Sequence, residues 1–544
     1  MPCVRNLKAI GLCRYRRPLF WAKRPEILGR RTDMRGGRFG SSVSTFMNVH
    51  RQSMEADHAA RARSRASSME QAMRTAKPSG ALGDGRLANL KDIEASGTFG
   101  GNGLFLGGLN GRLLFFNGDG PLLTYARTGA GKGRDLILPN LAHVRDRSLI
   151  VADPKDGENA FVSARHRSEV LGQKCIFLNP YKINGDAFPD TRINPFQLLI
   201  DIVERGDRID SEAGEIAHIL IPRPVKSDGE EWVRSGSLRL TATVLEYLAI
   251  FDANSCNPQR LWEFANSSGF DLEASFALME SCGLPSIEGR AASFNLVRKD
   301  APKQWEAYKS SLSDALAPFA PGGAIANSTS HSEFSLARLK HEPHTVYLML
   351  PSDKLEVGAL WVSLIVNYAI ETIARERGAL RTTFILDEFA QLPPIGAVPK
   401  ATRLYRSKGI QLWFFAQGRF SLRERWPEVL AKEFEDQAAV VTMRSVSEPE
   451  LMRDIEHWSG NRTILNWGVA HNGSTVNSAN ANLGESKRSV LQSEDIAALG
   501  LARQIIKVAT MPNLIVSDCV PFYFVSPWKD QIGDVRALHK GEAL

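Results

Sequence analysis

A glycine-rich turn that ends in Gly-Lys is the feature of this 544-residue chain that most constrains its fold. Residues 126–133 read Ala-Arg-Thr-Gly-Ala-Gly-Lys-Gly, directly after an apolar run at 122–125 and directly before a helical pattern at 135–138. In a strand–loop–helix unit of this kind, glycines let backbone N–H groups approach a phosphate and the lysine adds a positive charge. The turn therefore predicts a phosphate-binding loop.

A second motif follows much later in the chain, where residues 384–389 read Phe-Ile-Leu-Asp-Glu-Phe. This is an apolar strand that ends in two carboxylates. Asp387 is suited to hold Mg²⁺, and Glu388 is suited to orient or deprotonate an attacking water. Each motif alone has an ordinary explanation, either a solvated turn or a strand capped by acids. The two together, each in the local context that it needs, predict an NTPase.

The loop departs from the consensus G-x-x-x-x-G-K-[ST] at two positions. Ala126 stands where the first glycine is expected, and Gly133 replaces the hydroxyl residue that would ligand Mg²⁺. These departures leave room for a protein that binds nucleotide weakly or without hydrolysing it.

Composition narrows the class of protein. The six cysteines are scattered, with no spacing that suggests a zinc site or a disulfide framework. The net charge of +7 is uneven, because residues 1–80 hold 17 Lys and Arg against five Asp and Glu. Such a segment is typical of a solvated tail, and also fits binding to nucleic acid or anionic lipid. No apolar run reaches the ~18 residues of a membrane-spanning helix, so we expect no transmembrane segment.

The order of short strands and helices predicts an α/β protein. Strands alternate with helical segments from about residue 98 to 200, which indicates a mostly parallel sheet wrapped by helices. From 211 to about 321 the apolar spacing is helical throughout, and the alternation then resumes. We therefore predict a basic, disordered segment at 1–95, a nucleotide-binding domain at 96–205 and 325–544, and an all-α insertion at 206–324.

Several short motifs, in order, resemble the type IV coupling proteins, the TraG/TraD-like conjugative DNA-transfer ATPases. The resemblance covers about 100–535. It rests on six segments, which are TGAGKGRDLILPNL (128–141), VADPKDGE (151–158), the two Asn-Pro signatures FLNP (177–180) and RINPF (192–196), FILDEFAQLP (384–393) and SKRSVLQSEDI (486–496). Most members of that family begin with two membrane-spanning helices, which we do not expect in this chain, and carry Pro where Arg127 stands.

The resemblance implies a RecA-like P-loop NTPase domain carrying an all-α domain, with ATP and Mg²⁺ as cofactors. It also implies a ring hexamer that feeds single- or double-stranded DNA, without sequence preference, to a type IV secretion channel. The cargo would be a relaxase, a relaxosome or an effector protein. The implied location is the bacterial cytoplasm, with peripheral association at the inner membrane.

Individual residues receive expected roles. Lys132 should contact the β- and γ-phosphates, cradled by the loop residues Thr128, Gly129, Ala130, Gly131, Gly133 and Arg134. Asp387 should hold Mg²⁺, and Glu388 should act on water. By resemblance, Gln417 would sense the γ-phosphate, and Arg488 or Lys487 would reach a neighbouring subunit's nucleotide. Asp153 and Lys155 would either join the site or form a structural ion pair.

Two other functions remain open at this point. One is a DNA translocase of the FtsK/HerA type that acts apart from secretion, against which the helical insertion and the Asn-Pro signatures argue. The other is a substrate-receptor platform that does not hydrolyse nucleotide. DNA contacts cannot be assigned; the basic residues Arg403, Arg406 and Lys408 form a candidate patch or simply an exposed helix face.

Overall fold

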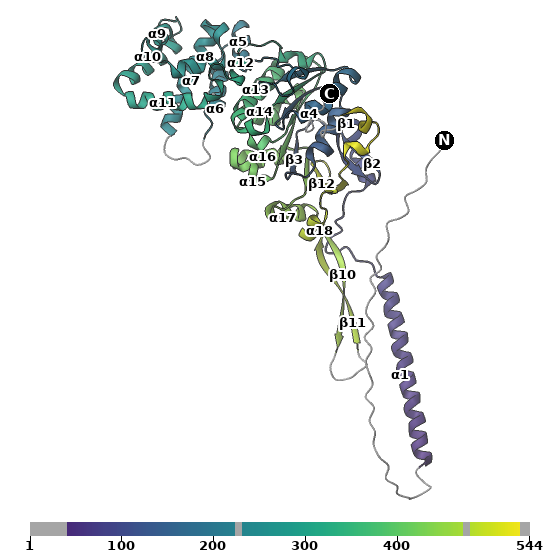
Figure 1. Ribbon diagram of the computed structural model, residues 1–544. Helices are drawn as coiled ribbons and strands as arrows, with labels where there is room; N and C mark the ends of the chain where they lie inside the picture. Colours follow the sequence, from purple (N-terminus) through teal and green to yellow (C-terminus); the bar gives the residue numbers. More distant parts are fainter. Residues whose placement is uncertain (1–40, 224–230, 472–478, 534–544) are drawn as a thin grey trace, which may run out of the picture. The chain divides into compact units, whose positions relative to one another are not determined.

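The computed structural model describes residues 41–223, 231–471 and 479–533 (Figure 1). Its contacts divide the chain into two compact units. The smaller unit contains the helix α1 (Ser41–Thr75) and the distal part of a hairpin formed by β10 (Asn461–His471) and β11 (Ala479–Ser489). The larger unit begins at Pro78 and contains all the other elements.

The helix α1 corrects part of the disorder predicted for residues 1–95. It runs for 35 residues, and every described side chain on it is exposed. Alanine, arginine, methionine, glutamate and glutamine favour helix locally even without an apolar face. Residues 78–95 also differ from the expectation, because Ala88 and Ile93 are buried in the larger unit. Residues 1–40 lie outside the described part of the chain.

An 11-stranded sheet forms the centre of the larger unit, in the order β2-β1-β13-β12-β9-β3-β8-β7-β4-β6-β5. The strands from β9 to β5 are parallel, and the strands beyond β9 are antiparallel. Their bounds are β1 (Phe99–Leu109), β2 (Arg112–Phe116), β3 (Leu122–Ala126), β4 (Ser148–Asp153), β5 (Lys174–Leu178), β6 (His344–Met349), β7 (Thr382–Leu386), β8 (Ile410–Ala416), β9 (Val440–Arg444), β12 (Arg503–Val508) and β13 (Ile515–Asp518). The α/β class with a mostly parallel sheet is confirmed.

Alternate residues along the strands belong to two different apolar layers, as the two-residue period of a strand requires. Leu122 and Trp413 lie in one layer, with the helices α3 (Leu138–His143) and α4 (Glu158–Arg165). Leu123 and Leu412 lie in the other. That second layer includes α13 (Leu355–Arg375), α14 (Ala397–Leu404) and α16 (Glu428–Gln437).

One helix in the described part of the chain, Ser352–Arg375, is long and apolar enough to cross a membrane by length and composition alone. It covers the sheet, and 89% of its most apolar 18-residue stretch is buried inside the protein. Packing against the sheet therefore accounts for its apolar character.

The described residues between β5 and β6 contain no strand. Six helices form the helical group: α6 (Asp210–Leu220), α7 (Glu231–Phe251), α8 (Pro258–Asn266), α9 (Gly269–Glu280), α10 (Pro285–Asp300) and α11 (Pro302–Ala315). In Figure 1 these helices gather beside the sheet rather than on its faces. Flanking helices α5 (Gln197–Glu204) and α12 (Ala324–Ser328) lead into and out of the group.

The chain enters and leaves the helical group through two segments that bond to each other. The N–H of Ile193 donates to the carbonyl of Ser328 (3.0 Å), and the N–H of Glu333 donates to the carbonyl of Arg192 (2.9 Å). The side chain of Asn194 donates to the carbonyl of Cys256, inside the group (2.7 Å). These bonds join the two connecting segments to each other and to the helical group.

The remaining helices are α2 (Leu90–Ser96), α15 (Arg419–Arg425), α17 (Pro449–Trp458), α18 (Ser493–Ala498) and α19 (Trp528–Gln531). Neither the hairpin β10–β11 nor the long helix α1 was predicted from the sequence.

Candidate functional site

The predicted phosphate loop connects β3 to the first turn of the following helix. Gly129 and Gly131 have φ values of +79° and +76°, which glycine adopts without steric cost. A Cβ placed at Gly129 or Gly133 would meet no atom within 4 Å, so open space adjoins the loop on both sides of Lys132. The loop thus has the backbone form and the free space that a bound phosphate needs.

The helix after the loop begins with a wide turn. Gly133–Ile137 form a π-helical turn in which the N–H of Leu138 donates to the carbonyl of Gly133. Pro139 has no N–H to donate, and its ring crowds the carbonyl four residues earlier, which accounts for the wide turn. The next residue, Asn140, pairs with the backbone of Phe105 at 2.8 and 2.9 Å. The helix is thereby held against β1.

A buried ion pair holds the loop from the other side. Arg444, at the end of β9, pairs with Asp135, and each side chain is only 1% exposed. Arg444 also donates to the carbonyl of Gly131 (3.2 Å). Asp135 in addition accepts from Arg134 at 2.5 and 2.9 Å. Sequence reasoning missed Arg444, because no local pattern marks an arginine at the end of an ordinary strand.

The structure brings Lys132 to both predicted carboxylates. Its Nζ lies 2.9 Å from Asp387 Oδ1 and 2.5 Å from Glu388 Oε1. The Lys132 side chain is 6% exposed and that of Asp387 is 2% exposed, so these charges meet in a nearly dry corner. The two motifs that the sequence separates widely therefore form one site.

Glu388 reaches Lys132 through an unusual backbone conformation. Its φ is +53°, a left-handed value that costs a non-glycine residue energy and that concentrates at functional sites. Gln417, just after β8, places its Nε2 3.4 Å from Glu388 Oε2. The strand β8 lies between β3, which precedes the loop, and β7, which precedes Glu388. The Gln417 amide therefore reaches the Glu388 carboxylate from the strand next to it.

The segment that follows β4 adds a second lysine. Lys155 Nζ lies 3.0 Å from Asp387 Oδ2 and 3.6 Å from Glu388 Oε1. Asp153 has a different role, since its carboxylate accepts from the Asn159 side chain (3.1 Å) and from the N–H of Ala160 (2.9 Å). Of the pair named from the sequence, Lys155 joins the site and Asp153 fixes the start of α4.

The two lysines determine the charge state of Asp387. Burial alone would raise its pKa, but Lys132 and Lys155 together hold the pKa below the usual value. The raised pKa of Lys155 reflects the same attraction to Asp387, which outweighs burial. Asp387 is therefore an anion, as a ligand for a divalent cation must be.

Arg488 is not brought to this corner by any contact among the described residues. It lies in β11, and its nearest ion-pair partner is Asp495 at 3.8 Å. Its side chain is 38% exposed. Its role as an arginine finger stays a prediction.

The basic patch at 403–408 is partly neutralised within the chain. Arg403 pairs with Glu433, and Arg406 lies 2.5 Å from Asp119. These pairings weaken the case for the patch as a DNA contact.

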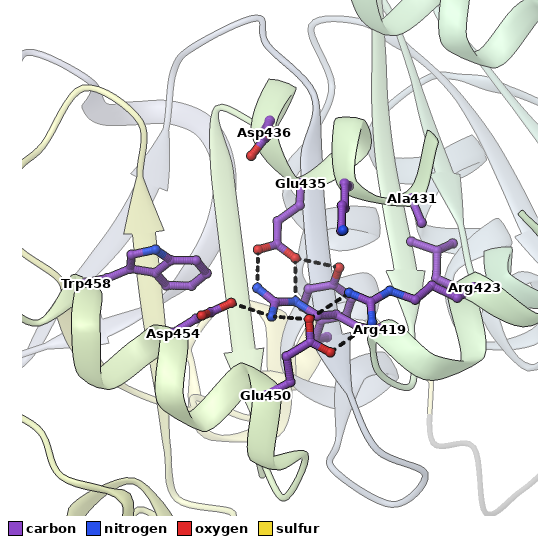
Figure 2. Close-up of a pocket in the computed structure, with 11 residues that line it drawn as sticks. Arg419, Arg423, Ala431, Glu435, Asp436, Glu450, Asp454 and Trp458 are labelled. Carbon is purple, nitrogen blue, oxygen red and sulfur yellow. Dashed lines mark hydrogen bonds and ion pairs between the residues drawn. The ribbon is translucent and has the colours of Figure 1, made fainter. Parts of the chain in front are cut away.

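Figure 2 shows a network of charged side chains in which Arg419 lies among Glu435, Glu450 and Asp454. Arg419, two residues after Gln417, lies 2.5 Å from both Glu435 and Asp454. The Tyr125 hydroxyl, just before the phosphate loop, donates to Glu435 (2.9 Å). Arg419 is 7% and Glu435 11% exposed, whereas Asp454 is 44% exposed, so the Arg419–Glu435 pair is the buried part of a brace between the loop strand and the helices α15, α16 and α17.

Comparison with known proteins identifies the family. Residues 84–536 match the family model described as "Type IV secretory system Conjugative DNA transfer". This chain belongs to that family.

Two curated relatives are conjugal transfer proteins TraG from Escherichia coli. One is 24% identical over 386 residues, and the other is 23% identical over 381 residues. Each match covers 63% of this chain and 58% of the relative, so the chain spans little more than half of the relatives' length.

Solved structures of a bacterial conjugative coupling protein show the same fold. Unbound TrwBdeltaN70 has a TM-score of 0.57 and 16% identity, and the match covers 80% of this chain and 92% of that one. TrwB in complex with the ATP analogue ADPNP gives a TM-score of 0.57 at 17% identity, with 80% and 93% covered. The RecA-like P-loop fold with a helical domain and the resemblance to type IV coupling proteins are both confirmed.

The buried brace generates a stability prediction. Replacing Arg419 with Met leaves Glu435 and Asp454 without their cation, and we expect the free energy of unfolding to fall by about 3 kcal/mol in urea denaturation. The control is Arg165→Met, which removes an exposed pair with Glu169 and should cost about 0.5 kcal/mol or less. Equal losses in the two variants would contradict the brace.

The buried Asp153 generates a pH prediction. Burial raises its pKa to about 7, against the lowering effect of its hydrogen bonds from Ala160 and Asn159. The folded state then binds more protons than the unfolded state between about pH 4 and pH 7, so stability falls as pH rises through that window.

Asp153→Asn removes this dependence. Between pH 4 and pH 8, we expect the free energy of unfolding to fall by roughly 3 kcal/mol more in the parent protein than in Asp153→Asn. Denaturation at each pH measures this difference. The exposed control Asp186→Asn should follow the parent curve. A curve for Asp153→Asn identical to the parent would show that Asp153 is ionised throughout.

Proposed function

We propose that this chain is an ATPase that couples hydrolysis to the transfer of DNA, with attached protein, into a type IV secretion channel. The observation that carries the proposal is the contact of Lys132 with both Asp387 and Glu388 in a buried corner beside an open phosphate loop. Family membership supplies the biological setting.

The residues present fit a nucleotide with Mg²⁺. TrwB is described in complex with ADPNP and with ADP and Mg²⁺. In this chain the N–H groups from Gly129 to Gly133 and the Lys132 ammonium would hold phosphates, and Asp387 would hold the metal ion. Mg²⁺ neutralises charge on the phosphates and orients them. Because Gly133 has no hydroxyl, water and phosphate oxygens would supply the other ligands.

The lysine changes partners when phosphate arrives. In the structure it neutralises Asp387 and Glu388; a phosphate close to its ammonium competes with these carboxylates for the same charge. Glu388 is thereby released to accept a proton from water, while Gln417 stays beside it. The left-handed backbone at Glu388 supports this proposed role, because such strained conformations concentrate at functional sites.

The remaining parts of the proposal rest on the family. The active form would be a homohexameric ring at the cytoplasmic face of a bacterial inner membrane, next to the secretion channel. It would grip the phosphate backbone of DNA without reading bases, which suits a motor that moves any sequence. A relaxase, relaxosome or effector protein would be the cargo, and Arg488 would act on the nucleotide of the adjacent subunit.

Two substitutions test the chemistry. Glu388→Gln should keep ATP binding and lose turnover by at least about 100-fold, because only the proton acceptor is lost. Lys132→Ala should lose both. Phosphate release and calorimetric binding of ATP check these outcomes, with the exposed Glu169→Gln as control. Turnover by Glu388→Gln at the parent rate would refute the role of this carboxylate.

A further experiment tests whether the ATPase depends on ring assembly and on DNA. If the ATPase needs an arginine from a neighbour, its rate per chain should rise steeply with protein concentration and respond to single-stranded DNA. Arg488→Ala should abolish both effects, by up to about 10³-fold in rate, while nucleotide binding persists. Arg503→Ala, at an arginine that is 60% exposed and lies 3.4 Å from Asp518, is the control. Linear concentration dependence without a DNA effect would favour the receptor platform instead.

A further inference from the structure

The segments that precede five adjacent strands meet at one end of the sheet. The strands β8, β7, β4, β6 and β5 are neighbours and run parallel, so their amino ends share one side. Asp387 and Gln417 follow the opposite, carboxyl ends of β7 and β8. The name basic rim is used for the segments at the amino ends, which are 145–147, 170–174, 338–343, 376–381 and 404–409.

Hydrogen bonds between neighbouring segments make the rim one continuous surface. The N–H of Thr382 donates to the carbonyl of Gly409 (2.8 Å), which joins the starts of β7 and β8. The N–H of Ser148 donates to the carbonyl of Arg381 (3.0 Å), and its hydroxyl donates to that of Leu339 (2.9 Å). Five strands at their usual spacing of ~4.8 Å give this surface a width of about 20 Å.

The rim concentrates positive charge. It holds nine Lys and Arg against three Asp and Glu. Residues 1–80 hold 17 Lys and Arg against five Asp and Glu, so the remainder of this +7 chain is net negative. The charge of the rim is therefore opposite in sign to that of the part of the chain in which it lies.

Most of these cations have no acidic partner. Arg147 lies 2.9 Å from Asp146, and Lys174 lies 3.3 Å from Glu342. Arg406 reaches outside the rim to a carboxylate before β3. Among the described residues, no carboxylate lies within ion-pair distance of the other rim cations, which are Arg145, Arg338, Lys340, Arg377, Arg381 and Lys408.

The crowding of positive charge affects Arg381. Burial lowers the pKa of this half-buried arginine, and the neighbouring cations Arg147 and Arg406 lower it further. The acidic residues Asp119 and Asp146 act in the opposite direction without restoring it. Repulsion among like charges is relieved when anions bind beside them, so the rim is suited to a surface of negative charge.

We propose that the basic rim docks this chain on an anionic membrane surface, with its cations against lipid phosphates. Leu404, before β8, and Val170, before β5, are 66% and 63% exposed and would enter the headgroup layer. Each Lys or Arg held near such a surface contributes about 1 kcal/mol of attraction. The inference rests on the proposed function for its membrane setting, and it does not depend on the nucleotide chemistry.

The form of the rim favours lipid over nucleic acid. The amino ends of parallel strands present their cations in a row, which matches a planar array of headgroups. The only Phe, Trp or Tyr of the rim, all of whose residues are described, is Tyr405, which is partly buried and donates to Glu371 (3.4 Å). The rim therefore has no exposed ring for stacking with bases, whereas exposed Leu and Val side chains gain from contact with a bilayer.

Docking in this way leaves the phosphate loop accessible. The loop and its carboxylates lie at the carboxyl ends of the strands, and the rim lies at the amino ends. A membrane at the rim would therefore face away from the nucleotide site.

The test measures cosedimentation of the full chain with phosphatidylcholine vesicles that contain about one third phosphatidylglycerol, at about 0.1 M salt. The rim variant combines Arg145→Gln, Arg338→Gln, Arg377→Gln and Lys408→Gln, all at exposed side chains. We expect it to bind these vesicles at least about tenfold more weakly than the parent, and neither protein to bind pure phosphatidylcholine. Residues 1–80 are the same in every variant, so their positive charge cannot account for a difference.

The matched control removes the same charge elsewhere. It combines Arg205→Gln, Arg239→Gln, Lys299→Gln and Lys303→Gln, at exposed cations without an acidic partner among the described residues of the helical group and its flank. This variant should bind like the parent. Thermal unfolding confirms that both variants fold, and Arg338→Gln with Arg377→Gln should give a loss of about threefold if the fourfold rim variant does not fold.

A second pair of variants tests contact with the apolar layer. Leu404→Ser should weaken vesicle binding about threefold, because it removes an apolar side chain from the interface. It should leave any binding to duplex DNA unchanged, since phosphates gain nothing from a leucine. Val429→Ser, at a valine of α16 that is 76% exposed, is the control and should bind like the parent.

Several outcomes would overturn the inference. Parent-like vesicle binding by the rim variant, or equal losses in the rim and control variants, would show that the rim is a solvated surface. A rim variant that loses affinity for duplex DNA but not for vesicles would assign the rim to nucleic acid. ATP turnover by a parent protein that binds no vesicles would refute the rim alone, and rim-dependent vesicle binding without turnover would refute the ATPase alone.

Discussion

The compensation of buried charge at the ends of four adjacent parallel strands organises this molecule. An isolated ion in a dry site costs several kcal/mol, and the cost falls only when opposite charges meet with good geometry. Here the strands β3, β8, β7 and β4 lie side by side, and the segments after them supply two cations, two anions and an amide. These charges are consequently balanced within the chain, and each of them also has a part in the proposed binding of phosphates.

The motif residues and most strands were predictable because their signals are local. Lys132 lies in a glycine turn, Asp387 and Glu388 follow an apolar strand, and the central strands read as short continuous apolar runs because both of their faces are buried. The two arginines of the buried ion pairs were not predictable. Arg444 and Arg419 act through partners that are distant in sequence, and nothing in their immediate surroundings distinguishes them from surface arginines. The helix α1 was missed for the opposite reason, since its propensity is strong but its apolar periodicity is absent.

The Asn-Pro signatures acquire a physical meaning from the structure. Asn179 donates to the carbonyls of Ile183 and Phe188 and accepts from the N–H of Ile183, which closes the loop after β5. Asn194 bonds the backbone of Phe196 and of Cys256. A carboxamide presents one donor group and one acceptor, as a peptide unit does, and so it replaces missing backbone partners in irregular segments. The two Asn-Pro motifs are therefore structural, in contrast to the phosphate loop and the strand that ends at Asp387 and Glu388.

The two segments through which the chain enters and leaves the helical group have a consequence for how the protein unfolds. An inserted group joined by two independent linkers can open by itself, as a separate cooperative unit. Here the linkers are hydrogen-bonded to each other, and Arg375 of α13 pairs with Glu212 of α6 across the same junction at 2.7 Å. Opening the helical group requires breaking bonds that also order the sheet side. We therefore expect the two parts to share one unfolding transition, with amide exchange in the helical group tied to the stability of the whole larger unit.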